Sequence, residues 1–317
     1  MQQPLIQTVH LKKYFETPRG LLHAVDDINI SIERGRTLGV VGESGCGKST
    51  LGRVMLRLLE PTSGQMLFEG EDIFQYNKNK LKDLKKDMQI ILQDPYSSLN
   101  PRMTVSEIIA EPLLVTKTVR GKANIARHIS KLMDTVGLAE RLAMAYPHEL
   151  DGGRRQRIGV ARALAVNPKF VVCDEPVSAL DVSIQAQILN LLMDLQRDMG
   201  LTYLFITHDL SVVKHISHDI AVMYLGNNVE RCPSDELFAN PLHPYTQALL
   251  SSIPLPKLNH GTMQQEVIRG ELASPIDPKP GCRFAIRCPE CKDACIGQDI
   301  PLIEYSPNHF ISCVKYL

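Results

Sequence analysis

A glycine-rich segment near residue 45 constrains the fold of this chain more than any other feature. It reads Gly42-Glu43-Ser44-Gly45-Cys46-Gly47-Lys48-Ser49-Thr50 and fits the pattern G-x-x-x-x-G-K-[ST]. The apolar run Thr37–Val41 predicts a buried strand before it, and Leu51–Leu59 predicts a helix after it. This order is typical of a loop whose backbone N–H groups bind phosphate. Lys48 then reaches the β- and γ-phosphates of a nucleotide, and the Ser49 hydroxyl helps hold Mg²⁺.

The composition narrows the classes of protein that the chain can belong to. The 317 residues include 35 basic and 35 acidic side chains, so there is no basic excess that would indicate nucleic acid as a partner. The chain has no run of about 18 apolar residues, which a membrane span needs. Its N-terminus lacks the basic-then-apolar layout of a signal peptide. We therefore expect a soluble protein of the cytoplasm.

Up to about residue 250, short apolar runs alternate with segments of helical period. We expect further buried strands at Met88–Leu92, Phe170–Cys173 and Tyr203–Ile206. We expect helices at 104–116, 123–137, Gly153–Val166 and 183–199. Residues 5–35 and 64–73 alternate apolar and polar side chains, which predicts an antiparallel sheet. The fold class is therefore α/β, with a mostly parallel core sheet, an antiparallel β subdomain and a helical subdomain at about 95–165.

Two acidic residues follow the expected strand Phe170–Cys173. Asp174 and Glu175 lie at its carboxyl end, where ligands bind in open α/β sheets. Asp174 can support Mg²⁺ through its water shell, and Glu175 can polarise an attacking water as a general base. The alternative is a pair of solvated acids in a turn, and the phosphate loop favours the first interpretation.

The composition changes past residue 252. Five prolines interrupt this part of the chain too often for helices or long strands: Pro254, Pro256, Pro275, Pro278 and Pro280. Five of the eight cysteines also lie there, between Cys282 and Cys313. We therefore predict two domains, a nucleotide-binding domain at 1–252 and a small Pro- and Cys-rich module at 253–317.

With these motifs in this order, the chain resembles the ATP-binding-cassette family over residues 5–250. The resemblance implies ATP and Mg²⁺ as ligands, and ATP hydrolysis by Lys48, Gln93, Glu175 and His208. It implies that Tyr14 stacks on adenine, that Gln93 senses Mg²⁺ and contacts membrane subunits, and that His208 contacts the γ-phosphate. It further implies that a loop crosses the dimer interface, and this loop is Ser178-Ala179-Leu180-Asp181.

The signature segment of that family differs in this chain. The family reads Leu-Ser-Gly-Gly-Gln where this chain reads Leu150-Asp151-Gly152-Gly153-Arg154. In the family this segment covers the ATP held by the opposite subunit, so Asp151 would bring a carboxylate to the γ-phosphate. Two like charges about 4 Å apart near a surface repel by roughly 4 kcal/mol, which Arg154 offsets in part. Asp is also a preferred N-cap for the helix that follows. We predict a heterodimer with a second ATP-binding subunit whose signature is intact.

The C-terminal region is similar to peptide importers of the oligopeptide and dipeptide branch, which some nickel importers share. Four segments bear the similarity: Pro241 to Leu250, Gly270-Glu271 with Ser274-Pro275, Gly281-Cys282-Arg283-Phe284, and Arg287-Cys288-Pro289. The resemblance implies a peripheral subunit on the cytoplasmic face of the cell membrane that powers peptide import. It also implies two membrane permease subunits and, indirectly, an extracytoplasmic peptide-binding protein.

Two other functions remain as alternatives at this point. One is a soluble cassette ATPase outside transport, but such chains usually have two cassettes or long coiled coils. The other is an efflux subunit, which is often fused to its membrane spans. This chain has a single cassette and no heptad run.

The C-terminal cysteines are the remaining candidate site. Cys282, Cys288, Cys295 and Cys313 have the spacing C-x5-C-x6-C-x17-C, and four thiolates brought together bind a metal tightly. Relatives in the peptide branch include chains with a four-iron, four-sulfur cluster on cysteines at such spacing. A zinc site on the same cysteines and four free thiols are the alternatives, with Cys291 as a substitute ligand. The other three, Cys46, Cys173 and Cys232, are expected to be small core or loop residues.

Overall fold

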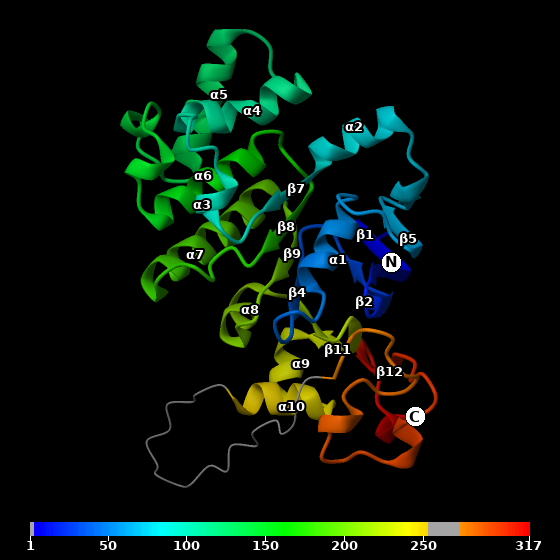
Figure 1. The fold of residues 1–317 in the computed structure, drawn as a ribbon. Coiled ribbons are helices and arrows are strands. Elements are labelled where there is room, and N and C mark those ends of the chain that lie inside the picture. The colour runs from blue at the N-terminus through cyan, green and yellow to red at the C-terminus, as the bar shows by residue number, and fades with distance from the viewer. Residues whose placement is uncertain (1–2, 253–272) are drawn as a thin grey trace, which may run out of the picture. The chain divides into compact units, whose positions relative to one another are not determined.

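The computed structural model describes residues 3–252 and 273–317, which form two compact units (Figure 1). Among the described residues, the first unit comprises Glu33–Arg36 and Gln75–Ile206, and the second comprises Gln3–Ile32, Thr37–Phe74 and most of Thr207–Leu317. Pro254, Pro256 and Gly270-Glu271 lie outside the described residues. The predicted domain boundary at residue 252 stays a prediction.

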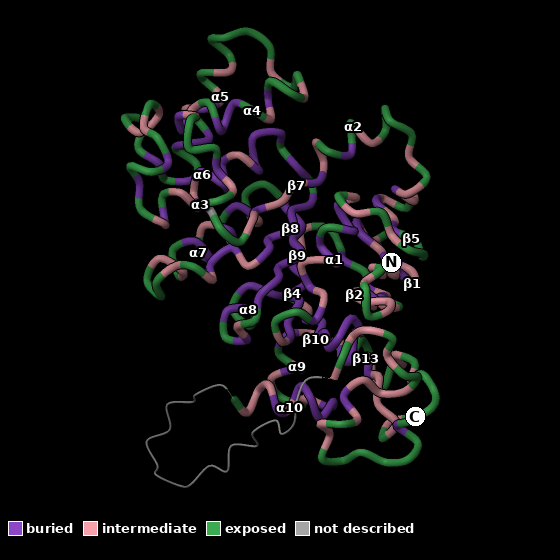
Figure 2. Tube along the Cα trace, in the orientation of Figure 1, coloured by how far each residue is buried: buried purple, intermediate pink, exposed green. Residues whose placement is uncertain are grey.

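The first unit is a parallel β-sheet with helices around it. Its strands are β7 (Met88–Ile91), β8 (Phe170–Asp174) and β9 (Thr202–Ile206). Its helices are α2 (Lys78–Asp87), α3 (Pro95–Ser98), α4 (Val105–Thr116), α5 (Lys122–Thr135), α6 (Gly152–Leu164) and α7 (Val182–Met199). Strand β8 pairs in parallel with both β7 and β9. Figure 2 shows β8 and β9 buried along their length, as their apolar β-branched and aromatic residues predict.

The second unit contains an antiparallel sheet and a second, mixed set of strands. The antiparallel strands are β1 (Ile6–Thr17), β2 (Gly20–Ile28), β3 (Ser31–Ile32), β5 (Ser63–Phe68) and β6 (Glu71–Asp72). The mixed strands are β4 (Thr37–Val41), β10 (Asp219–Tyr224), β11 (Asn227–Pro233), β12 (Ile303–Ser306) and β13 (His309–Ile311). The helices are α1 (Lys48–Met55), α8 (Leu210–Ile216), α9 (Ser234–Ala239) and α10 (Pro244–Ser251).

The C-terminal residues continue the sheet that leads to the glycine-rich loop. Strand β4 pairs in parallel with β10, and β10, β11, β13 and β12 then pair antiparallel in that order. Apart from β12 and β13, residues 273–317 form only short helical turns and loops, as the prolines predict. Phe284 from this region packs with Tyr224 and Tyr245 in the core of the second unit.

The predicted buried strands and helices agree with the structure to within two residues at each end, except for one helix. The helix predicted at Leu51–Leu59 starts earlier, at Lys48, and ends at Met55. Its predicted end is wrong because Arg57 has a φ of 51°, which a right-handed helix does not allow. The antiparallel sheet predicted at 5–35 and 64–73 is confirmed. Within the described parts of the chain, no helix combines the length and the apolar character that crossing a bilayer requires.

Candidate functional site

The glycine-rich loop follows β4 and leads directly into α1, as its motif predicts. Gly42 and Gly47 have φ values of 151° and 105°, and both lie against backbone. A Cβ on Gly42 would come within 2.1 Å of the Met223 carbonyl oxygen, and one on Gly47 within 1.9 Å of the Ala24 carbonyl oxygen. Only glycine fits these two positions, so the curl of the loop is fixed by its neighbours.

Lys48 is the first residue of α1, and its side chain turns back over the loop. Its Nζ donates hydrogen bonds to the Gly42 and Glu43 carbonyl oxygens at 2.7 and 3.0 Å. The residue is only 5% exposed, so its ammonium is held at the loop and not in solvent. No side chain caps α1, and its positive N-terminal end adds to the attraction for a phosphate.

Glu43 joins the loop to the C-terminal region, which the sequence did not predict. Its backbone N–H donates to the Tyr245 hydroxyl at 2.9 Å. Its carboxylate forms a two-pronged ion pair with the Arg287 guanidinium, with N–O distances of 2.9 and 3.1 Å. The bond to Glu43 raises the pKa of Arg287 above its usual range. Tyr245 and Arg287 therefore hold the loop in place at Glu43, its second residue.

Tyr14, the predicted adenine-stacking residue, lies on β1 beside β2. Its ring stacks on His23 with centroids 3.8 Å apart, and its hydroxyl donates to Asp26. Burial raises the pKa of Tyr14, and the hydrogen bond to Asp26 raises it further. Because His23 covers one face of the ring, an adenine has only the opposite face to stack on.

His208 follows β9 and belongs to the second unit, with the phosphate loop. The Thr207 N–H donates to the Val40 carbonyl at 3.1 Å, which fixes the backbone before His208 beside β4. Asp209 after it caps α8 by accepting from the Ser211 N–H at 2.8 Å. His208 therefore lies between two residues that hydrogen bonds hold in place. Val40, which accepts from Thr207, is two residues before Gly42, where the loop begins.

The first unit brings two of the predicted catalytic residues together. Gln93 lies two residues after β7, and its Nε2 donates a 2.9 Å hydrogen bond to the Glu175 carboxylate. Asp174 ends β8 and is buried, whereas Glu175 has a φ of 49°. A non-glycine residue in this region is strained, and such strain is concentrated at functional sites. Asp174 belongs to the first unit, whereas Lys48 belongs to the second.

The segment Leu150 to Arg154 forms the start of α6. Asp151 is its N-cap, accepting the Arg154 N–H at 2.8 Å, and its other oxygen lies 3.3 Å from the Arg154 guanidinium. The predicted cap is confirmed, and the compensation of the Asp151 charge by Arg154 at a bound ATP stays a prediction. Gly152 and Gly153 allow close packing, since a Cβ on each would come within 3.1 and 2.8 Å of the Leu180 and Ile184 side chains.

The loop Ser178 to Asp181 packs against that segment and is fixed at both ends. The Ser178 hydroxyl donates to the Glu175 carbonyl at 3.1 Å. Asp181 caps α7 by accepting from the Ile184 N–H at 2.9 Å. The loop therefore links the candidate base Glu175 to the signature segment within one unit.

Four cysteines line one pocket in the C-terminal region: Cys282, Cys288, Cys295 and Cys313. The Cys295 sulfur accepts the Lys292 N–H at 3.4 Å. Burial raises the pKa of Cys282 to about 11, and the neighbouring thiols add to the rise. Such N–H groups stabilise thiolates and tune a metal bound to them.

Cys291 differs from the four pocket cysteines. Its side chain is exposed, it does not line the pocket, and its thiol faces the Lys292 carbonyl at 3.8 Å. The three remaining cysteines, Cys46, Cys173 and Cys232, are buried. Their prediction as small core residues is confirmed for Cys173 in β8 and Cys232 in β11.

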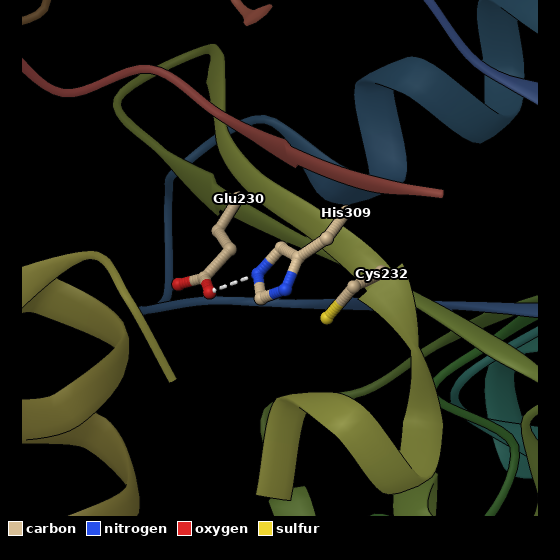
Figure 3. A group of neighbouring side chains, drawn as sticks. All are labelled: Glu230, Cys232 and His309. Atoms are coloured by element: carbon tan, nitrogen blue, oxygen red, sulfur yellow. Dashed lines mark hydrogen bonds and ion pairs between the residues drawn. The ribbon is translucent and has the colours of Figure 1, made fainter. Parts of the chain in front are cut away.

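A second group of possible ligands is Glu230, Cys232 and His309, drawn in Figure 3. Their ligand atoms lie within 4.8 Å of one another, and all three residues are buried. Glu230 already accepts from His309 Nε2 at 2.8 Å and from the Leu242 and His243 N–H groups at 2.8 and 2.9 Å. Because this β11 carboxylate accepts three hydrogen bonds, one from β13 and two from the residues directly before α10, the group holds β11, β13 and the start of α10 together. Sequence reasoning missed it, because Glu230 lies in a strand with Asn227, Asn228 and Arg231, where a glutamate does not stand out.

Two regions of the chain match known protein families. Residues 25–178 match the ABC transporter family, and residues 229–295 match the C-terminal region of oligopeptide/dipeptide transporters. Together they include the phosphate loop, the signature segment, the carboxylate pair and three of the four pocket cysteines.

Three curated proteins are similar along almost their whole length. The chain is 50% identical over 316 residues to the oligopeptide transport ATP-binding protein OppF of Bacillus subtilis (strain 168), with 99% of this chain and 98% of OppF covered. It is 49% identical over 325 residues to AppF, an oligopeptide transport ATP-binding protein of the same organism, with 99% and 98% covered. It is 48% identical over 305 residues to OppF of Salmonella typhimurium (strain LT2), with 96% and 91% covered.

Two solved structures share the fold. The cbiO1 protein of Clostridium perfringens, part of the ABC transporter complex cbiONQ, matches with a TM-score of 0.67 and 27% identity over 75% of this chain and 92% of that one. The ATP-binding cassette MJ0796, solved as a dimer bound to ADP and Pi, matches with a TM-score of 0.65 and 26% identity over 72% and 98%.

Proposed function

Because the chain belongs to the ABC transporter family, in its oligopeptide/dipeptide branch, we propose that it hydrolyses ATP to power the import of oligopeptides or dipeptides. The observation that carries this proposal is the pairing, in one chain, of a complete phosphate loop with the C-terminal region of peptide transporters. That region favours transport over a soluble ATPase of another kind.

The phosphate loop binds the nucleotide in this proposal. Lys48 Nζ exchanges its bonds to the Gly42 and Glu43 carbonyls for bonds to the β- and γ-phosphates. The remaining residues of the loop supply backbone N–H groups: Ser44, Gly45, Cys46, Gly47, Ser49 and Thr50. The open face of the Tyr14 ring stacks on adenine. Ser49 and Gln93, with support from Asp174, would hold Mg²⁺, which would supply positive charge to neutralise the phosphates.

Glu175 and Gln93 carry the hydrolytic step. Glu175 accepts a proton from the attacking water, and Gln93, bonded to its carboxylate, orients that carboxylate and reports its position to the membrane subunits. His208, held beside β4, contacts the γ-phosphate. The strained backbone at Glu175 supports this assignment, because such strain persists where the surroundings fix a functional residue.

We propose that the chain works as a heterodimer with a second ATP-binding subunit. Its own loop, with Glu175 and His208, pairs with an intact signature of the partner. Asp151 faces the partner's ATP, where its charge lowers affinity and slows hydrolysis. Arg154 compensates this charge locally, so we expect a weakened site and not an empty one.

The complete assembly contains two membrane permease subunits and receives substrate from an extracytoplasmic peptide-binding protein, with this chain at the cytoplasmic face of the membrane. Purification of the tagged chain from detergent-solubilised membranes tests this. We expect two polytopic membrane proteins and one further ATP-binding chain to co-purify, with ATPase activity that peptide stimulates. A chain that purifies alone, with ATPase activity that peptide and permeases leave unchanged, would contradict the proposal.

We propose that the pocket cysteines Cys282, Cys288, Cys295 and Cys313 hold a metal centre. Four cysteines that line one pocket bring together the thiol ligands that a metal centre needs. A zinc ion with Zn–S bonds of about 2.3 Å draws its thiolates to about 3.8 Å from one another. Among the described residues, no three pocket sulfurs lie within 4.8 Å of one another.

We propose a four-iron, four-sulfur cluster as the occupant, with zinc on the same four cysteines as the alternative, because such a cluster takes one thiolate on each iron. The cluster would order this proline-rich region and supply redox chemistry when bound. Elemental analysis of anaerobically purified protein tests the assignment. We expect about four irons per chain and a visible absorption band that bleaches on reduction. One zinc per chain, or no metal, would contradict it.

A further inference from the structure

Two arginines next to the pocket cysteines reach the two ends of the candidate nucleotide site. Arg283 follows Cys282 and contacts Asp26, the partner of Tyr14. Arg287 precedes Cys288 and contacts Glu43 in the phosphate loop. We propose that Arg283 and Arg287 are positioning residues for ATP, and that they fix the adenine and phosphate ends of its site from the C-terminal region. The inference rests on the nucleotide site of the proposed function.

The ion pair between Arg287 and Glu43 restricts the movement of both side chains. The two terminal guanidinium nitrogens each bond one oxygen of the carboxylate, and the Arg287 side chain is only 7% exposed. The same guanidinium donates to the Tyr224 hydroxyl at 3.2 Å. A planar two-pronged pair of this kind fixes direction as well as distance, so it fixes the second residue of the loop.

The charge of Glu43 gives Arg287 a second effect. Glu43 lies in the loop that receives the phosphates, and a carboxylate there repels them unless its charge is compensated. Arg287 supplies that compensation and points the carboxylate toward the C-terminal region. Removing the guanidinium therefore both frees the loop and leaves an unpaired negative charge beside the ligand.

Arg283 acts in the same way at the other end. It donates to Asp26 and to the Leu225 carbonyl, and its side chain is 8% exposed. Asp26 in turn accepts from the Tyr14 hydroxyl and from His23, which stacks on the Tyr14 ring. Burial alone would raise the pKa of Asp26, but these hydrogen bonds and the Arg283 charge lower it, so the carboxylate stays ionised. Arg283 thus fixes the ring that stacks on adenine.

The C-terminal region itself is fastened firmly enough to transmit these contacts. The buried hydrogen bond between Glu230 and His309 holds β13 against β11. Phe284, which lies between the two arginines in sequence, is buried among aromatic rings. The edge of the Phe284 ring meets Tyr224, whose hydroxyl bonds Arg287. The segment that contains Arg283 and Arg287 is therefore fixed in position by its packing against the second unit.

Nucleotide affinity separates the two roles. In the complete assembly, we would measure binding of a fluorescent ATP analogue, and of inorganic triphosphate by competition. Arg287→Ala should weaken both ligands by about tenfold or more, because it changes the phosphate end. Arg283→Ala should weaken the ATP analogue but leave triphosphate within about twofold, because it changes only the adenine end. Arg197→Ala, which removes an exposed ion pair on α7, is the control.

A double variant separates the effect of the unpaired Glu43 charge from that of a folding defect. Glu43→Gln combined with Arg287→Ala should recover much of the affinity lost in Arg287→Ala, because it removes the unpaired charge, whereas a folding defect would persist. Arg287→Lys should recover part of it, since one ammonium restores the charge but not the fork. Equal affinity of Arg287→Ala and wild type, or equal loss with and without Glu43→Gln, would overturn the inference. Failure of the wild type to bind ATP would instead overturn the proposed function.

Discussion

The side-chain amide of Gln93 donates a 2.9 Å hydrogen bond to the carboxylate of Glu175, although 82 residues separate them. Gln93 follows β7 and Glu175 follows β8, and these two strands are parallel neighbours. Because parallel strands end at the same edge of a sheet, the pair lies where ligands bind in α/β folds. This arrangement supports our proposal that Glu175 is the base and Gln93 its orienting partner.

Glu175→Gln should keep ATP binding and lose hydrolysis. The new amide has nearly the same shape and can still accept from Gln93, but it cannot take a proton. We expect the rate of phosphate release to fall by about a hundredfold or more, with nucleotide affinity unchanged within about threefold. The matched control is Glu140→Gln, which neutralises an exposed glutamate bonded to Ser130. Hydrolysis at the wild-type rate in Glu175→Gln would exclude Glu175 as the base.

Asp151→Ser should change the function of the assembled complex and leave the stability of the chain unaltered. Serine is as good an N-cap as aspartate, so the free energy of unfolding should stay within about 0.5 kcal/mol of wild type. Asp151→Ala removes the cap and should cost about 1 kcal/mol. Urea denaturation measures both.

In the complex, Asp151→Ser removes the charge that faces the partner's ATP. We expect higher nucleotide occupancy and a faster ATPase rate, measured with both ATP-binding subunits present. If rate and occupancy stay the same, the asymmetry between the two sites does not come from Asp151.

Glu230→Ala should destabilise the second unit strongly. It leaves His309 and two backbone N–H groups without their buried acceptor, which costs about 3–5 kcal/mol. Glu60→Ala breaks an exposed pair with Arg57 and should cost less than about 1 kcal/mol. The urea midpoints of the two variants test this, and equal midpoints would show that the buried group does not fasten the C-terminal region.

Cys288→Ser and Cys291→Ser should differ in metal content. Cys288 lines the pocket, whereas Cys291 is exposed outside it. We expect Cys288→Ser to lose most of its iron and visible absorption, and Cys291→Ser to keep both. The opposite result, in which Cys291→Ser loses its metal and Cys288→Ser keeps it, would contradict the assignment and identify Cys291 as a ligand.

Local features could be predicted from the sequence because local forces determine them. Strand β4 starts and ends where the apolar run Thr37–Val41 does, since each of its residues is buried. Asp151 was predicted as a cap because a short acceptor before a helix satisfies its first N–H groups. The end of α1 was missed because the left-handed backbone at Arg57 has no clear signal in an arginine.

Contacts between distant residues could not be predicted. Arg283 and Arg287 meet partners 257 and 244 residues away, and nothing in the spacing of the cysteines indicates this. Glu230 and His309 are 79 residues apart and meet only because β11 and β13 pair. The one local signal was unused: Arg283 and Arg287 each lie directly beside a cysteine, and a charged residue in such a segment needs a partner when it is buried.

The most direct measurement is ATP-dependent uptake of a labelled oligopeptide by proteoliposomes that contain this chain with its ATP-binding partner, the permease subunits and the peptide-binding protein. The wild-type complex should take up peptide only when ATP is supplied on the side of this chain. Lys48→Ala should abolish uptake and lower ATP hydrolysis, because the loop loses the ammonium that binds the phosphates. Uptake that continues in the Lys48→Ala complex at the wild-type rate would contradict the account.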